Sequence, residues 1–204
     1  MPGTRATTRV HLVRHGAHSL IDRVLVGRME GVPLSEEGRR QAYSLNRRLG
    51  TRRVTGIYTS PSQRARETAE IVAERIGLTP EVTTRLDEIN FGSWTGRTFS
   101  QLDADPGWRY WNEARSRARP PGGETMGEAQ ARALRFISEA HRARPGSTIV
   151  MVTHAEIIRA VVLHCLAWPL DAWAGVDIAP ASVTTLDIRP SGSALVSLDQ
   201  RAAA

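Results

Sequence analysis

An arginine and a histidine stand next to each other where a largely apolar run of this chain ends. Residues 10–13 are followed directly by Arg14 and His15, and a second apolar run, residues 148–153, is followed by His154. A neutral imidazole can attack phosphorus, and a guanidinium can bind two phosphate oxygens at once. These residue types therefore predict a site for a phosphoryl group, provided that both runs deliver them to one place.

Two further ionisable residues follow elements of the same kind. Arg64 lies in the first turn or so of a helical segment that comes after an apolar run, and Glu88 lies in the loop "RLDEINFGSWTG". Arg66 is an alternative to Arg64 at this site. However, it lies two positions further along the helix and therefore points to a different face. Asp87 competes with Glu88, and either carboxylate can face the site. We expect Arg64 to join Arg14, His15 and His154 in a cationic cage around the phosphoryl group. We expect Glu88 to supply a carboxylate.

The rest of the chain predicts how these side chains are positioned. Runs of strand length alternate with segments of helical spacing, and they cover residues 10–13, 56–59, 148–153, 182–188 and 194–198. This alternation is typical of an α/β fold with a mostly parallel sheet. In such a sheet, ligands bind beyond the carboxyl ends of the strands, where loops and helix N-termini meet. His15 and His154 are therefore expected to reach one pocket from separate strands.

Helix boundaries can also be predicted from the sequence. Ser35 is expected to cap one helix, and Ser60 to cap the next, with Pro61 at its first helical position and Gly77 at its end. Two more helical segments are expected within residues 124–146 and 154–168.

One segment, residues 97–123, does not follow this alternation. Its Pro and Gly residues indicate an insertion over one end of the sheet, a lid where substrate preference would be set. Trp108 and Trp111 either pack inside this lid or contact the substrate. We expect its arginines to form a solvated face, with steering of anionic substrates as the alternative; they are Arg115, Arg117 and Arg119.

Length and composition limit the possible classes of protein. The chain has 204 residues, of which 41% are apolar and 24% charged, which predicts one domain over residues 1–204. No apolar run is long enough to cross a membrane, and "MPGTRATTRV" lacks the apolar stretch of a secretory signal. We therefore expect a soluble, cytoplasmic protein without a membrane partner.

The net charge is +6, and all 27 basic residues are arginines. A codon bias explains this better than phosphate binding over the whole surface. The arginines are scattered, and no helix-turn-helix, zinc-knuckle or aromatic RNA-binding motif accompanies them. We expect no nucleic-acid partner.

Five ordered motifs resemble those of a known family, the histidine phosphatase superfamily, also called phosphoglycerate-mutase-like. They are "LVRHG", "YTSPSQRARETA", "LDEINFGSWTG", "GGET" and "IVMVTHAEIIR". The resemblance extends over about residues 9–190. It implies a three-layer α/β/α sandwich, and the length of the chain resembles the phosphatase branch rather than the longer mutases.

The resemblance also implies a role for each residue of the cage. His15 corresponds to the nucleophile that becomes phosphohistidine. Arg14, Arg64 and His154 correspond to the residues that hold the phosphate, and Glu88 corresponds to the proton donor to the leaving oxygen. The implied activity is hydrolysis of a small phosphorylated metabolite, a phosphomonoester.

The chain departs from the family pattern after the first histidine. The family often has Glu or Gln after RHG, then Thr or Ser, and Asn a few residues later, whereas Ile21 stands at the usual Asn position. His18, Ser19 or Asp22 would then supply the missing contact on the phosphate side. His18 is also an alternative to Glu88 as the acid. These departures concern the identity of the substrate more than the class of reaction.

Two other functions remain open at this stage. A phosphoglycerate mutase would use the same site and return the phosphoryl group to a second hydroxyl. A catalytically silent phosphate-binding module is the other alternative, and the intact set of cage residues argues against it. The motifs contain no ligand spacing such as HxxxH, so that we expect neither a metal nor another cofactor.

Overall fold

A mixed β-sheet forms the centre of the computed structural model, which describes residues 6–49 and 53–201. Among these residues, six strands lie in the order β3-β2-β4-β1-β5-β6. Strands β1 to β4 run parallel to one another, whereas β5 pairs antiparallel with both β1 and β6. The strands are β1 (Thr8–Arg14), β2 (Gly56–Thr59), β3 (Glu81–Val82), β4 (Thr148–Thr153), β5 (Val183–Arg189) and β6 (Gly192–Gln200). The five predicted strands are present; β3 was not predicted.

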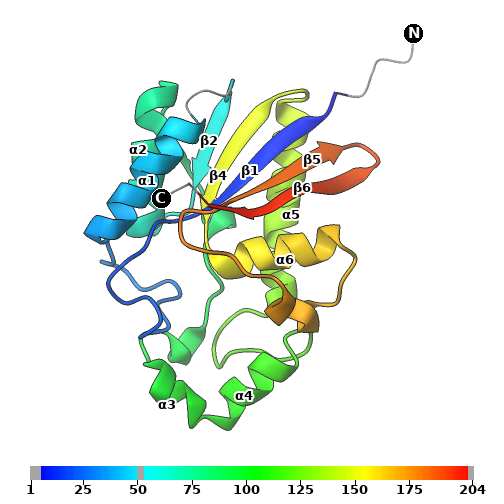
Figure 1. The fold of residues 1–204 in the computed structure, drawn as a ribbon. Coiled ribbons are helices and arrows are strands. Elements are labelled where there is room, and N and C mark those ends of the chain that lie inside the picture. The colour runs from blue at the N-terminus through cyan, green and yellow to red at the C-terminus, as the bar shows by residue number, and fades with distance from the viewer. Residues whose placement is uncertain (1–5, 50–52, 202–204) are drawn as a thin grey trace.

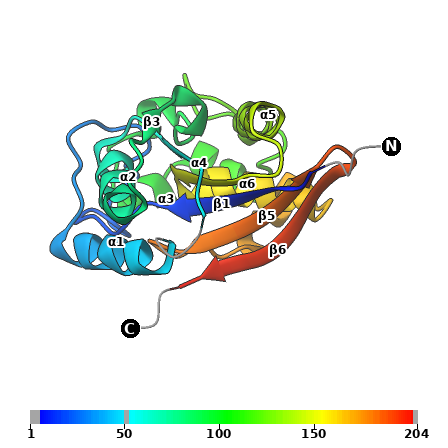
Figure 2. The same ribbon diagram turned by 90° about the horizontal axis from the view of Figure 1, so that it is seen from above.

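Helices cover both faces of the sheet (Figures 1 and 2). On one face, apolar side chains of α1 and α2 pack on those of the strands, and on the other face those of α5 and α6 do so. The helices are α1 (Glu36–Leu49), α2 (Gln63–Ile76), α3 (Phe99–Asp103), α4 (Pro106–Glu113), α5 (Met126–Ala143) and α6 (Ala155–Cys165). Short 3-10 turns are η1 (Thr84–Leu86), η2 (Gly92–Trp94) and η3 (Leu170–Gly175). The three-layer α/β/α sandwich is confirmed.

The pairing of the two central strands brings His15 and His154 to the same edge of the sheet. β1 and β4 pair in parallel, with Arg14 opposite Thr153 at their carboxyl ends. The backbone N–H of His15 donates to the carbonyl of Thr153 at 3.0 Å. Because both chains leave the sheet at this point, His15 and His154 start from adjacent positions on the same edge.

The predicted cap of α1 is confirmed, but that of α2 is wrong. Ser35 Oγ accepts the Gly38 N–H at 3.1 Å, and Gly77 ends α2 with a left-handed φ of 74°. However, α2 begins at Gln63 rather than at Pro61, and Ser62 occupies the cap position without a side-chain cap bond. The Ser60 hydroxyl is instead committed to Asp87 and lies too early in the chain to cap α2.

The predicted insertion, residues 97–123, contains α3 and α4 and lies beyond the carboxyl ends of the parallel strands (Figure 1). Trp108 and Trp111 are buried and form edge-to-face contacts with Phe91. The expectation of a solvated face is wrong for Arg115, which is 3% exposed, and holds for the exposed Arg117 and Arg119. Arg115 is buried because it lies over the Trp173 ring and pairs with Glu156. No helix of the described part of the chain is long and apolar enough to cross a membrane.

Candidate active site

His15 is held as a neutral imidazole with one nitrogen free to react. Its Nδ1 lies 2.8 Å from the carbonyl oxygen of Gly16, and because a carbonyl can only accept, Nδ1 carries the proton. The lone pair therefore lies on Nε2, which accepts the Arg64 Nε–H at 3.2 Å. Burial lowers the pKa of His15 well below its usual value, and Arg64 and Arg14 lower it further. The arrangement provides a nucleophilic nitrogen at neutral pH.

Arg64 connects the two histidines. Its Nη2 donates to the Gly27 carbonyl at 2.7 Å and lies 3.2 Å from His154 Nδ1. Its Nη1 is buried and has no hydrogen-bond partner within residues 6–49 and 53–201. Arg66, its competitor in the sequence, is exposed. The structure therefore brings Arg64 into the pocket, and an anion there would satisfy its unpaired N–H groups.

Arg14 contributes the second guanidinium of the cage. Its Nη1 donates to the carbonyl of Ile178 at 2.6 Å, which fixes the side chain at the end of β1. Its buried Nε has no partner in the part of the chain that the structure describes. Burial lowers the pKa of Arg14, but an arginine remains charged at neutral pH. Two fixed cations thus face the cavity beside His15.

His154 is oriented by a chain of hydrogen bonds that the sequence did not reveal. Its Nε2 lies 2.8 Å from Ser60 Oγ, and that hydroxyl donates to Asp87 Oδ1 at 3.0 Å. Because the hydroxyl proton goes to Asp87, Ser60 accepts the Nε2–H of His154. The Nδ1 lone pair then faces Arg64. Asp87 thus lies behind the histidine, which separates it from its neighbour Glu88.

Glu88 lines the cavity and is 8% exposed. Its Oε1 accepts the Ile89 backbone N–H at 2.9 Å. Burial raises the pKa of Glu88 to about 7, with the Glu156 carboxylate adding to the effect and Arg64 and Arg14 opposing it. A carboxyl group with such a pKa is partly protonated near neutral pH, which is the state that a proton donor needs.

Of the three candidate contacts that follow Gly16, the structure places His18 and Asp22 at the cavity but not Ser19. His18 lines the cavity, and its ring centroid lies 5.5 Å from that of His15. Burial lowers its pKa to about 4, and Arg64 and Arg14 act in the same direction. Ser19 is exposed and is not among the cavity-lining residues. Ile21, at the usual Asn position, does line the cavity and adds an apolar wall.

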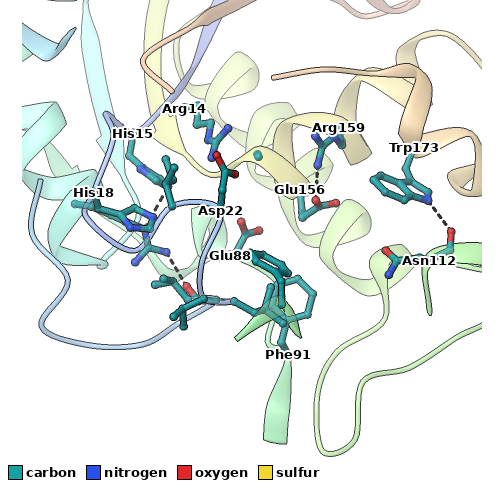
Figure 3. A pocket seen from close by; sticks show the side chains of 18 of the residues that line it. Arg14, His15, His18, Asp22, Glu88, Phe91, Asn112, Glu156, Arg159 and Trp173 are labelled. Carbon is teal, nitrogen blue, oxygen red and sulfur yellow. Dashed lines mark hydrogen bonds and ion pairs between the residues drawn. The ribbon is translucent and has the colours of Figure 1, made fainter. Parts of the chain in front are cut away.

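The cavity extends well beyond the phosphoryl cage and has a volume of about 370 Å³. In Figure 3, Arg14, His15 and His18 lie at one end, Glu88 lies in the middle, and a second group lies at the other end. This outer group consists of Asn112, Glu156, Arg159 and Trp173, together with Arg115, which bonds both Glu156 and Asn112. This group was not predicted from the sequence, although Glu156 lies in the same motif as His154.

Comparison with known proteins agrees with this geometry. The model of the histidine phosphatase superfamily (branch 1) matches residues 10–201. The chain belongs to this superfamily. Among curated proteins, it is 35% identical over 178 residues to a glucosyl-3-phosphoglycerate phosphatase of Mycobacterium tuberculosis, a match that covers 81% of this chain and 78% of the relative. This likeness favours the phosphatases of the superfamily.

Two further relatives carry the names of a mutase and of a phosphatase. A Klebsiella pneumoniae protein named "Probable phosphoglycerate mutase GpmB" is 31% identical over 186 residues, which covers 90% of this chain and 86% of the relative. A solved mycobacterial glucosyl-3-phosphoglycerate phosphatase in complex with VO3 has a TM-score of 0.84 at 33% identity, and the match covers 94% of this chain and 98% of that one. The chain is a phosphoric monoester hydrolase of the superfamily, and the mutase alternative is the weaker one.

Proposed function

We propose that this protein hydrolyses a small phosphomonoester through a phosphohistidine formed on His15 Nε2. The observation that supports this most directly is the neutral His15 tautomer, whose Nε2 lone pair adjoins Arg64 in the cavity. Nε2 attacks phosphorus, the bond from phosphorus to the ester oxygen breaks, and that oxygen takes the proton of Glu88. Water then attacks phosphorus, the bond from Nε2 to phosphorus breaks, and the Glu88 carboxylate takes a proton from the water.

The cationic side chains stabilise the transferring group. Arg14 and Arg64 offer buried N–H groups without partners in the described residues, and these suit the equatorial phosphoryl oxygens. Burial lowers the pKa of His154 well below its usual value, and a bound phosphate dianion would favour its protonation. The Asp87–Ser60 hydrogen bond behind His154 would help to hold that charge.

Glu88 is a better acid than His18 for this reaction. The pKa of Glu88 is raised to about 7, whereas that of His18 is lowered to about 4. At neutral pH a histidine with such a pKa is almost fully deprotonated and has little proton to give. We assign proton donation to Glu88 and a contact with the bound phosphate to His18.

Rapid mixing with p-nitrophenyl phosphate tests the covalent route. We expect a burst of nitrophenol near one equivalent of enzyme if hydrolysis of the phosphohistidine is slow, and acid-labile phosphate on the quenched protein. Phosphoryl transfer that depends on a bisphosphoglycerate primer would indicate a mutase instead. Binding of phosphate without turnover would indicate a silent module.

The proposed mechanism needs no metal ion, because the guanidinium groups neutralise the phosphate charge. The described residues contain no cluster of three or more His, Cys, Asp or Glu side chains that could hold one. We expect turnover of p-nitrophenyl phosphate to survive exhaustive EDTA treatment, as measured by initial rates before and after dialysis. A loss that Mg²⁺ or Zn²⁺ restores would contradict this expectation.

We further propose that the chain forms a single domain and that residues 97–123 act as its lid. We also propose that the protein acts in the cytoplasm. Trp108 lines the cavity from α4, whereas Trp111 of the same helix is fully buried and is not among the cavity-lining residues, which supports one substrate-facing and one packing role. Residues 1–5, 50–52 and 202–204 of the proposed domain lie outside the described residues.

A further inference from the structure

The segment that carries Glu88, residues 84–90, is held by side chains from distant parts of the chain. Arg28 Nε donates to the backbone carbonyl of Glu88 at 2.7 Å. Arg132, which lies on α5, donates from Nη1 to three further carbonyls at between 2.9 and 3.2 Å; they belong to Thr84, Arg85 and Asp87. Hydrogen bonds to so many backbone carbonyls fix the path of the segment, and with it the point from which the Glu88 side chain starts.

Glu124 joins these two arginines. Its Oε2 accepts an N–H of Arg28 Nη2 at 2.6 Å, and its Oε1 accepts an N–H of Arg132 Nη2 at 2.8 Å. Its backbone N–H donates to the carbonyl of Asn90, at the end of the same segment, at 2.8 Å. The side chains of Glu124 and Arg132 are 16% and 19% exposed, so that water and salt screen this pair only weakly. We refer to Arg28, Glu124 and Arg132 as the clamp.

The clamp lies outside the active-site cavity. None of its three residues is among the described residues that line this cavity, whereas Glu88 is. Its two guanidinium charges are matched by two carboxylates, those of Glu124 and Asp87, and Asp87 Oδ2 lies 3.6 Å from Arg28 Nε. The clamp therefore offers a substrate neither a contact nor a net charge. It can influence the reaction only through the segment that it holds.

We propose that the clamp positions Glu88 for proton donation, with Arg28 as the positioning residue that holds the Glu88 backbone. The proposal rests on the proposed function, which assigns proton donation to Glu88. Within the described residues, the Glu88 carboxyl group itself bonds only the N–H of the next residue, Ile89, so that its position follows that of the loop backbone. A donor must lie within hydrogen-bond reach of the leaving oxygen, and a displacement of about 1 Å can cost about a hundredfold in rate.

Arg28→Met tests the clamp by removing the donor to the Glu88 carbonyl. We expect kcat to fall by about ten- to a hundredfold for an alkyl phosphate, but by no more than about threefold for p-nitrophenyl phosphate, whose leaving group needs little protonation. The inhibition constant of inorganic phosphate should stay within about twofold of wild type, because the phosphoryl cage is unchanged. Arg28→Lys should recover part of the loss, since an ammonium group can still donate to the carbonyl.

A double-mutant cycle shows whether Arg28 acts through Glu88. In the Glu88→Gln background, Arg28→Met should slow the alkyl ester by no more than about threefold, because the group that it positions has already been removed. Arg119→Met is the matched control, since Arg119 also donates to a backbone carbonyl and to a carboxylate, those of Gly123 and Glu128. This control should leave the rates with both esters as they are in wild type.

The outcomes separate the clamp from the proposed function. Circular dichroism and thermal melting show whether Arg28→Met is folded; if it is not, Glu124→Gln, which removes the anion between the two arginines, replaces it with the same expected result. Wild-type rates, equal slowing of both esters, or an undiminished loss in the Glu88→Gln background would overturn the positioning role. If Glu88→Gln alone showed the leaving-group dependence in that case, the assignment of the acid would stand. If Glu88→Gln showed no such dependence, that assignment would fail, and the positioning role with it.

Discussion

Replacement of His15 by alanine is expected to abolish phosphatase turnover and acid-labile phosphate labelling together. The covalent route runs through Nε2, the nitrogen that the Gly16 carbonyl leaves unprotonated by binding Nδ1–H. Without it, water must attack phosphorus directly, and we expect kcat to fall by at least about a thousandfold. Stopped-flow assays with p-nitrophenyl phosphate and acid quenching after incubation with a labelled ester measure both quantities.

A matched histidine provides the control. His164 is exposed on α6, and His164→Ala should retain wild-type kcat and labelling. Thermal melting shows whether His15→Ala remains folded. Turnover in a folded His15→Ala protein within about tenfold of wild type would rule out His15 as the nucleophile.

Replacement of Glu88 by glutamine is expected to slow an alkyl phosphate far more than p-nitrophenyl phosphate. An alkoxide leaves poorly unless it is protonated, whereas nitrophenolate needs little help. We expect kcat to fall by about 10²- to 10⁴-fold for the alkyl ester and by much less for the aryl ester. The ratio of the two rates, measured for wild type and variant, isolates the proton donation.

The pH dependence of kcat/KM should also show that Glu88 donates the proton. The pKa of Glu88 is raised to about 7, so that the donor form is present below this pH and is lost as the pH rises through it. For an alkyl phosphate, kcat/KM should therefore fall above about pH 7. Well above this pH, it should fall by about tenfold for each further pH unit. This limb should disappear in Glu88→Gln.

Two other variants complete the test of the acid. Glu113→Gln changes an exposed carboxylate on α4 and should alter neither rate. From the sequence, Asp87→Asn would be an equally neutral control, but the structure connects Asp87 to His154 through Ser60, so that its loss should slow both esters. If His18→Ala showed the leaving-group dependence and Glu88→Gln did not, His18 would be the acid. Equal slowing of both esters by Glu88→Gln would mean that Glu88 only shapes the pocket.

The sequence by itself determined the class of fold and predicted the residues of the phosphoryl cage. Alternating apolar runs predicted the sheet, and the positions of His15 and His154 after two of those runs predicted that they meet. This works because a parallel sheet places all its carboxyl ends at one edge, so that the position along a strand is enough to locate a side chain. Arg64 was chosen over Arg66 on a similar ground, since helical periodicity separates their faces.

Only the tertiary structure decided what surrounds the cage. Ser60 had the local pattern of a helix cap, yet its hydroxyl bonds Asp87, 27 positions further along the chain. Arg115 had the pattern of a solvated face, yet it pairs with Glu156, 41 positions away. Local patterns report propensity and periodicity. The burial of a charge and the choice of its partner depend on which distant elements pack together, and so do the pKa of Glu88 and the outer end of the cavity.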